Sequence, residues 1–217
     1  MADSKITNLT EKTTVDGSEE LVINDSTADK KLLTRTIAEG FSQNFGSATN
    51  KYTISPIASD SVSVLAIVPD KLWFIPLIVG EQTTFTRIGV NVTSALASSE
   101  MCLGIYKADG DGRFPSTLIL DAGTVDTSTT GEKEITISQT LEPGIYHVAG
   151  VADQGISLTH DQASDQYGHW YGSSSGSGAT DSYISQSYSY DGTLPTTASS
   201  ISSASYPIIL RIWLRVV

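Results

Sequence analysis

Apolar and polar residues alternate along much of the chain after residue 60, and this two-residue period predicts a series of short β-strands. The alternation runs through residues 86–93, 101–105, 118–120, 135–137, 145–151 and 208–216. Within these segments, Thr86 and Ile88 are expected to share one face, as are Leu118 and Leu120. Turn-forming residues separate the segments. The pattern predicts an all-β fold, an antiparallel β-sandwich.

Two neighbouring segments, residues 62–68 and 72–79, are apolar on both faces. Strands of this kind lie deep in a sandwich or against another subunit, because a thin sandwich cannot easily hide both faces. Pro76 lacks the N–H group that a central strand needs, so we expect the second segment at a sheet edge or a β-bulge. Residues 208–216 show the alternation of a core strand, which fastens this end of the chain into a sheet.

Residues 1–50 differ from the rest, because they carry charges of both signs and only short apolar runs. Turn formers between two of these runs predict a two-stranded hairpin, and Thr36 could cap a brief helix after it. A lone hairpin buries too little apolar surface to be stable in water. We therefore interpret residues 1–50 as an anchor and linker that order against a neighbouring protein; the alternative is a frayed terminus that packs on its own domain. The candidate anchor residues are Leu21, Val22, Ile23, Leu32, Leu33 and Ile37.

Residues 51–217 are then predicted to form one β-sandwich domain, which contains a long loop, residues 154–206, rich in Ser, Gly and Tyr. Aromatic rings in such a background supply contact area at low entropic cost, as in adaptable binding loops. The alternative is that these rings cover the open end of the sandwich. The candidate receptor-facing residues are Tyr167, His169, Trp170, Tyr171, Tyr183, Tyr188 and Tyr190.

Charge and composition narrow the class of partner. The formal net charge of −11 repels phosphate backbones and anionic membrane surfaces, so no nucleic-acid partner is expected. Cys102, the single cysteine, cannot form an intramolecular disulfide, which suits synthesis in a reducing cytoplasm. Polar residues follow Met1, so no signal peptide is expected. The most apolar stretch is far shorter than the ~20 residues of a membrane-spanning helix, so no membrane insertion is expected.

The candidate metal ligands are weak, and we expect no cofactor. Asp109 and Asp111 could offer carboxylates to a calcium ion. Asp–Gly pairs are also strong hairpin signals, however, so we favour a turn over a metal site. The histidines, His147, His160 and His169, lack the close spacing with which two imidazoles share one zinc ion, and structural roles are favoured for them.

The sequence does not predict an enzyme. Residues 172–176 have the letters of a serine nucleophile motif, but they lie in low-complexity sequence rather than between a strand and a helix. The enzymatic alternative is a glycosidase, which needs two carboxylates across a cleft. The sequence does not exclude such a pair, for example Asp161 with Asp165.

Two parts of the chain resemble tailed-bacteriophage virion proteins. The first part resembles the N-terminal segment of many tailed-phage structural proteins, where it precedes varied distal domains, and comprises residues 1–11, 16–25 and 30–34. The second part resembles a β-sandwich module that recurs in such proteins and comprises residues 103–107, 114–125, 135–137 and 141–146. Neither motif is catalytic.

The resemblance implies a homotrimeric head decoration, head fibre or tail-fibre-type subunit on the virion surface. Its N-terminus would attach to the major capsid protein or a tail protein, and a jelly roll would face outward. The alternative is a tail-fibre or receptor-binding protein that recognises a host-surface glycan through the aromatic loop. The resemblance leaves open whether the subunit attaches to the head or the tail, which host is involved, and what the loop contacts.

Overall fold

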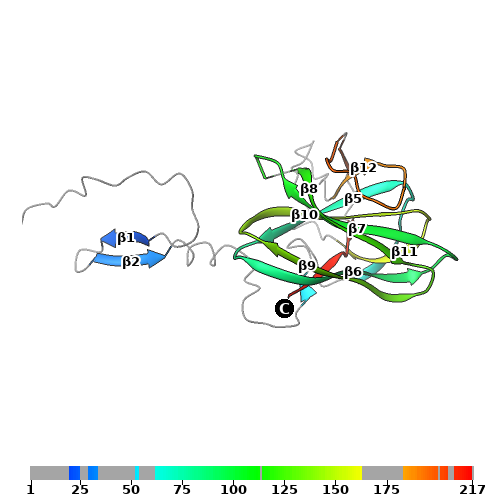
Figure 1. Ribbon diagram of the computed structural model, residues 1–217, viewed down its shortest axis with the longest axis horizontal. Helices are drawn as coiled ribbons and strands as arrows, with labels where there is room; N and C mark the ends of the chain where they lie inside the picture. Colours follow the sequence, from blue (N-terminus) through cyan, green and yellow to red (C-terminus); the bar gives the residue numbers. More distant parts are fainter. Residues whose placement is uncertain are drawn as a thin grey trace, which may run out of the picture. The chain divides into compact units, whose positions relative to one another are not determined.

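The computed structural model of the chain describes residues 20–24, 29–33, 52–53, 62–112, 114–162, 183–199, 201–204 and 208–216. The chain divides into two units, Met1–Ser42 and Gln43–Val217. In the first unit, β1 (Glu20–Asn24) pairs antiparallel with β2 (Asp29–Leu33). Figure 1 shows these two strands as a ribbon in blue. The two strands contain the apolar runs around which the hairpin was predicted.

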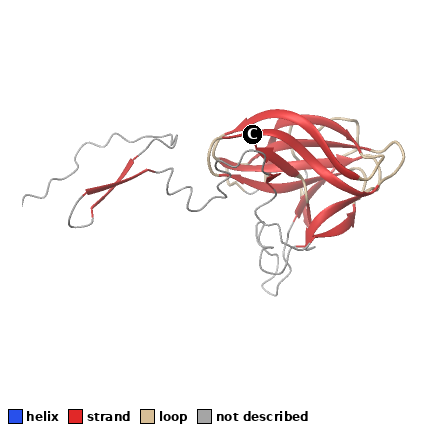
Figure 2. Cartoon of the chain, turned by 90° about the horizontal axis from the view of Figure 1, so that it is seen from below, coloured by secondary structure: helices blue, strands red, loops and turns tan. Residues whose placement is uncertain are grey.

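The second unit consists of two antiparallel β-sheets, and none of its described residues is helical (Figure 2). Across the first sheet the strands are β13 (Ser202–Ala204), β12 (Tyr183–Ser187), β5 (Lys71–Val79), β10 (Gly144–Ala152), β7 (Glu100–Ala108) and β8 (Pro115–Asp126). Across the second they are β14 (Ile208–Leu210), β11 (Ser157–Gln162), β6 (Thr83–Ser94), β15 (Trp213–Val216) and β3 (Tyr52–Thr53), with β4 (Val62–Ala66) on β11 and β9 (Gly131–Leu141) on β6. The predicted all-β sandwich is confirmed.

The consecutive strands β4 to β11 are distributed between the sheets in a regular way. One sheet contains the order β4-β11-β6-β9 and the other the order β5-β10-β7-β8. Only β7 and β8 are neighbours both in the chain and in a sheet; every other connection in this series passes from one sheet to the other. Most pairings therefore join segments that are distant in sequence.

The main core lies between the two sheets and contains many of the residues that the alternation placed on one face, such as Ile88 and Leu103. In residues 145–151 the alternation selected the other face of the sheet, because Ala149 and Val151 belong to a separate cluster while Val148 lies in this core. From the first sheet come Trp73, Ile75, Leu77, Met101, Leu103, Ile105 and Val148, and from the second Phe85, Ile88, Val90, Val92, Leu158, Leu210, Ile212 and Leu214. Each large apolar side chain that is fully buried contributes about 1.5–3 kcal/mol to stability. This core is the principal source of the sandwich's stability.

Register shifts correct two of the predicted faces. Between Phe85 and Arg87 the register of β6 changes against both β15 and β9, so Phe85 rather than Thr86 shares the core face with Ile88. In β8, the register shifts so that Leu120 is opposite Ile105 and Leu118 opposite Tyr106. Leu120 therefore packs on the core between the sheets, while Leu118 packs on the outer face. A β-bulge inverts the side on which later residues point, and a strict two-residue period cannot anticipate it.

The placement of Pro76 agrees with its chemistry. β10 pairs along the length of β5, whereas β12 pairs only with residues 71–74. Pro76 thus lies beyond the end of β12, where β5 has a free edge among the described strands. The segment as a whole is not an edge strand as predicted, because residues 73 and 74 pair with strands on both sides.

The predicted C-terminal strand is present but interrupted. β14 pairs with β11 and β15 with β6, and the break at Arg211 and Ile212 lets the chain pass from one neighbour to the other. Leu210, Ile212 and Leu214 all remain in the core across the break. The alternation therefore predicted burial correctly, although it did not predict the change of partner.

Candidate functional site

The outer face of the first sheet carries a second apolar cluster, separate from the main core. Its members are fully or almost fully buried: Leu72, Phe74, Cys102, Tyr106, Ala149, Val151, Ile184 and Leu194. The rings of Phe74 and Tyr106 meet edge to face, with centroids 5.2 Å apart. This cluster explains why the first part of residues 72–79 is apolar on both faces: Trp73 and Ile75 meet the other sheet, and the chain's own later residues cover Leu72 and Phe74.

The covering segment, residues 188–198, is here called the strap. It follows β12, which lies along β5 at one side of the sheet. At the opposite side it meets β8, where Leu118 N–H donates to the carbonyl of Thr196 (2.9 Å) and Ala198 N–H donates to that of Ser116 (2.8 Å). The strap is thus bonded to both sides of the sheet that it covers.

Side chains from three loops and strands hold the strap between those two points. Asp70 Oδ1 accepts the N–H of Tyr190 at 2.8 Å, and Asp121 Oδ2 accepts the N–H of Leu194 at 3.0 Å. The hydroxyl of the buried Tyr106 donates to the carbonyl of Pro195 at 2.7 Å. Because a polar group that loses water must find a new partner, these bonds fix the strap in one position.

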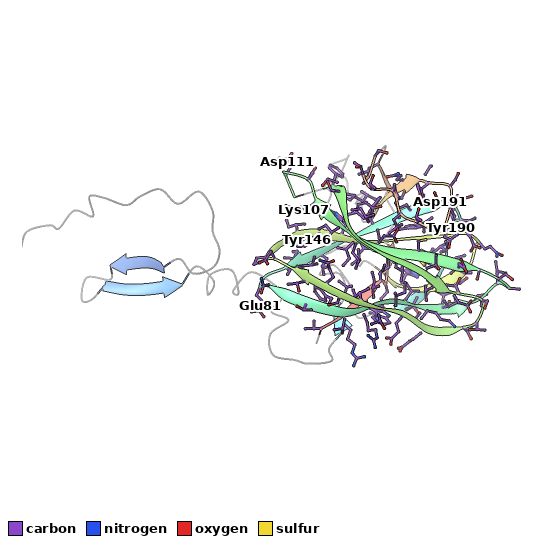
Figure 3. All side chains as sticks on the ribbon, viewed as in Figure 1. Glu81, Lys107, Asp111, Tyr146, Tyr190 and Asp191 are labelled. Carbon is purple, nitrogen blue, oxygen red and sulfur yellow. The ribbon has the colours of Figure 1, made fainter. Side chains whose placement is uncertain are left out.

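Two of the predicted receptor-facing residues, Tyr188 and Tyr190, lie on the strap and are half-buried against the outer cluster. The hydroxyl of Tyr188 donates to Asp191 at 3.0 Å and that of Tyr190 to Glu100 at 3.3 Å. Figure 3 shows Tyr190 and Asp191 on this side of the molecule. Burial raises the pKa of both tyrosines above its usual value. Their packing resembles the covering role that was the alternative to receptor contact.

Cys102 lies beneath the strap with no exposed surface. Burial raises the pKa of its thiol from 9.0 to about 11. Since the thiolate is the nucleophilic form of cysteine, this thiol is held in its unreactive state at neutral pH.

The side chains of the other predicted receptor-facing residues are outside the described part of the chain, so the structure does not place them beside the strap. Tyr183 lies in β12, but its side chain is outside the description, and Tyr167, His169, Trp170 and Tyr171 are outside it altogether. Among the predicted anchor residues, β1 contains Leu21, Val22 and Ile23, β2 contains Leu32 and Leu33, and Ile37 is outside the described residues. Their roles stay predictions.

The Asp109–Asp111 sequence forms the predicted turn between β7 and β8. The carbonyl of Asp109 accepts the N–H of Gly112 at 2.9 Å, and its carboxylate accepts the N–H of Phe114 at 3.2 Å. Gly112 has a φ of 71°, which glycine adopts without strain. Over the described ranges, no three His, Cys, Asp or Glu side chains are grouped closely enough to hold a metal ion.

The other candidates for chemistry lie apart. His147 is buried in β10 and His160 in β11, while His169 is outside the described residues. Asp161 lies in β11, but its side chain and the whole of Asp165 are outside the description, so the glycosidase alternative is not tested. No helix in the described residues is long and apolar enough to cross a membrane.

Sequence reasoning missed the residues that hold the strap, chiefly Asp70, Tyr106 and Asp121. The surrounding loop sequence is dominated by Ser, Gly and Tyr, and this composition does not decide between receptor contact and covering of the sandwich. Two signals were available: the aliphatic residues Ile184 and Leu194 within that loop, and the second apolar face of residues 72–79.

Comparison with known proteins does not identify a family for this chain. No model of a known protein family matches the sequence, and no curated protein matches it. One similar solved structure is chitosan-binding module 1 of a chitosanase/glucanase from Paenibacillus sp. IK-5, with 22% identity, 51% of this chain and 89% of that chain covered, and a TM-score of 0.28. A selenomethionine-labelled point mutant of the same module gives 23% identity, coverage of 51% and 88%, and a TM-score of 0.27. These TM-scores are too low to support an argument about function.

Proposed function

We propose that the chain is a non-enzymatic structural subunit on the surface of a tailed-phage particle, a jelly roll attached through its N-terminal unit. The observation that carries the proposal is the strand order β4-β11-β6-β9 facing β5-β10-β7-β8. This order fits a jelly roll of two four-stranded sheets, an architecture that is common in viral capsid proteins and also occurs in lectins.

The division of the chain supports the attachment part of the proposal. The unit Met1–Ser42 contains the paired strands β1 and β2. A two-stranded ribbon is marginally stable by itself, so it gains most from docking on a larger protein. The partner that we propose is the major capsid protein or a tail protein, and the attached form is a homotrimer, made in the host cytoplasm and assembled onto the particle.

An uptake experiment tests the proposal. Particles from a phage lacking the gene for this chain are mixed with the purified full chain, re-isolated, and imaged by cryo-electron microscopy. We expect saturable uptake with three copies at each position. A chain without residues 1–42 should remain folded in solution but should not be taken up.

Two results would contradict attachment through the N-terminal unit: no uptake of the full chain, or equal uptake of the shortened one. A variant with Val64→Ser, whose side chain is 58% exposed on β4, serves as the matched control and should be taken up normally.

A second candidate function is recognition of a host-surface glycan by a tail-fibre type of subunit. The same strand order supports it, because lectin domains share the jelly roll. Here the full chain should bind host cells saturably and select particular saccharides on a glycan array. Binding to neither host cells nor glycans, together with tight uptake by the particle, would leave only the decoration role.

A further inference from the structure

Four loops lie together at one end of the sandwich, and they are here called the loop end. They connect β4 to β5, β6 to β7, β8 to β9 and β10 to β11, and consist of residues 67–70, 95–99, 127–130 and 153–156. Because β4, β11, β6 and β9 are successive neighbours, the loops that follow or precede them at this end are neighbours too.

Hydrogen bonds join these loops to one another. Gln154 Nε2 donates to the carbonyl of Ala97 at 3.3 Å, and Ile67 N–H donates to that of Ile156 at 2.9 Å, so the β10–β11 loop is bonded on both sides. Thr127 Oγ1 donates to Ser99 Oγ at 2.8 Å, and neither residue has exposed surface. The loop end is therefore a preorganised surface, which lowers the entropic cost of binding a partner.

Two residues at the loop end adopt an unusual backbone conformation. Asp70 has a φ of 57° and Ser98 a φ of 61°, and they are the only residues other than glycine with positive φ in the described part of the chain. Such conformations are uncommon for residues with a side chain and tend to persist at binding and active sites.

The loop end also exposes aliphatic surface. Val68 is 55% exposed and Leu96 42% exposed, and these residues lie on the loops to either side of the β10–β11 loop. The adjoining Pro69 is exposed as well. An aliphatic centre on a rigid, otherwise polar surface is typical of a protein-interaction site.

Acidic side chains outnumber basic ones around this centre. Asp70 and Asp153 lie in the loops and Glu100 and Asp126 lie next to them, whereas the loops contain neither Lys nor Arg. One basic group from a neighbouring strand reaches the loops, because Lys133 Nζ donates to Thr129 Oγ1. Lys71, the first basic residue after the β4–β5 loop, has its ammonium group over the ring of Trp73, 5.2 Å from the centroid. The surface thus complements a partner with basic side chains.

The loop end and the start of β3 lie at opposite ends of the sandwich. β3 and β15 pair with each other, and β15 ends beside Phe85, near the start of β6, whereas the β6–β7 loop follows the far end of that strand. In Figure 3, Glu81 marks the loop between β5 and β6 and Asp111 the loop between β7 and β8, both at the other end of the sandwich.

We infer that the loop end is a docking surface for a polypeptide that presents basic side chains around an aliphatic centre. A saccharide is the less suitable occupant, because glycan sites use aromatic platforms and the four loops contain no Phe, Tyr or Trp. The inference deepens the proposed function, on which it rests for one point: that attachment through the N-terminal unit leaves the loop end free.

Fluorescence anisotropy with synthetic peptides tests this. The probe is a labelled peptide of alternating Lys and Leu, compared with a Lys homopolymer of equal charge and with a peptide of alternating Glu and Leu. We expect the full chain to bind the Lys/Leu peptide most tightly, and not to bind the Glu/Leu peptide. The double variant Val68→Ser with Leu96→Ser should bind the Lys/Leu peptide at least tenfold more weakly, with unchanged affinity for the homopolymer.

The matched control is Val64→Ser with Ile119→Ser, which removes the same kind of exposed side chain from β4 and β8 and should bind as the wild type does. Equal losses in both double variants, or none in the first, would overturn the inference. Saturable binding to an immobilised saccharide panel that is lost in the first double variant would also overturn it, because the occupant would then be a glycan. Self-association of the full chain in sedimentation that is abolished in the same variant would overturn it too, because the occupant would then be a second copy. Uptake by particles should be normal in the first variant, so this test can fail without affecting the proposed attachment.

Discussion

Gly89 lies opposite Trp213 where β6 pairs with β15, and the site has no room for a side chain. A Cβ atom at Gly89 would overlap the Trp213 ring and the backbone carbonyl of Lys133. We expect Gly89→Ala to lower the free energy of unfolding by about 1–3 kcal/mol, because neither neighbour can move without disturbing a strand. Urea denaturation measures the loss. Gly110→Ala, with no atom within 4 Å of the new Cβ, is the control and should unfold like the wild type.

Cys102 should make the stability of the protein depend on alkaline pH. Its pKa is raised from 9.0 to about 11 by burial, so the folded state holds the proton more tightly than the unfolded chain does. The resulting stabilisation is complete below pH 9 and is lost as the pH rises through about 11. Urea denaturation across this range should show the decline, and Cys102→Ala should make it shallower. Tyr106 and Tyr190, whose pKa values burial also raises, add to the decline at its upper end. A pH-independent stability would mean that the thiol is hydrated in the folded state.

At the level of elements, opening of the strap can be measured separately from unfolding of the whole sandwich. Asp121→Ala removes the acceptor of the Leu194 N–H and leaves a part-buried donor unpaired, which costs about 1–3 kcal/mol. We expect the strap to open more often, and therefore the thiol of Cys102 to react faster with a soluble disulfide reagent in native buffer. The measurement is the rate of thiol modification.

The control for that experiment is Asp126→Ala, which also removes a carboxylate that accepts a backbone N–H, but in the turn at Ser128 rather than on the strap. Its modification rate should equal that of the wild type. If Asp121→Ala also leaves the rate unchanged, the thiol becomes accessible only through global unfolding, and the strap and the sheet form one cooperative unit.

The strap also shows what the sequence can and cannot predict at this level. Alternation located the strands and the core face of residues such as Leu103 and Ile212, because burial on one face imposes a period of two. It misplaced Thr86 and Leu118, because one extra residue in a bulge inverts the face. It could not reveal that residues 188–198 cover β5 and β7, since that contact joins segments that are distant in the chain. The hydrogen bonds that hold the strap go to its backbone groups, which every sequence supplies.

At the level of the whole molecule, the pairing order β4-β11-β6-β9 and β5-β10-β7-β8 means that most contacts are between distant segments. Folds of this kind form slowly, because the entropy of closing long loops is lost before the contacts stabilise the chain. The apolar pattern supplied the class of fold but not this order, since any antiparallel sandwich would show the same alternation. The order therefore carries the functional proposal more than the composition does.

The two ends of the chain should differ sharply in what their removal costs. β15 lies between β6 and β3 and contributes the buried side chain of Leu214, so a chain ending at Ile212 loses a strand from within a sheet. Trp213, Leu214 and Val216 are each worth up to about 1.5–3 kcal/mol when buried, against a typical total stability of ~5–15 kcal/mol. We expect that shortened chain to be unfolded or aggregated by circular dichroism and calorimetry. A chain without residues 1–42, which form the other unit, should instead keep the melting temperature of the sandwich. A large fall in that temperature would show that the N-terminal unit packs on the sandwich, as a frayed terminus would, and would remove the reason for regarding it as an anchor for a second protein.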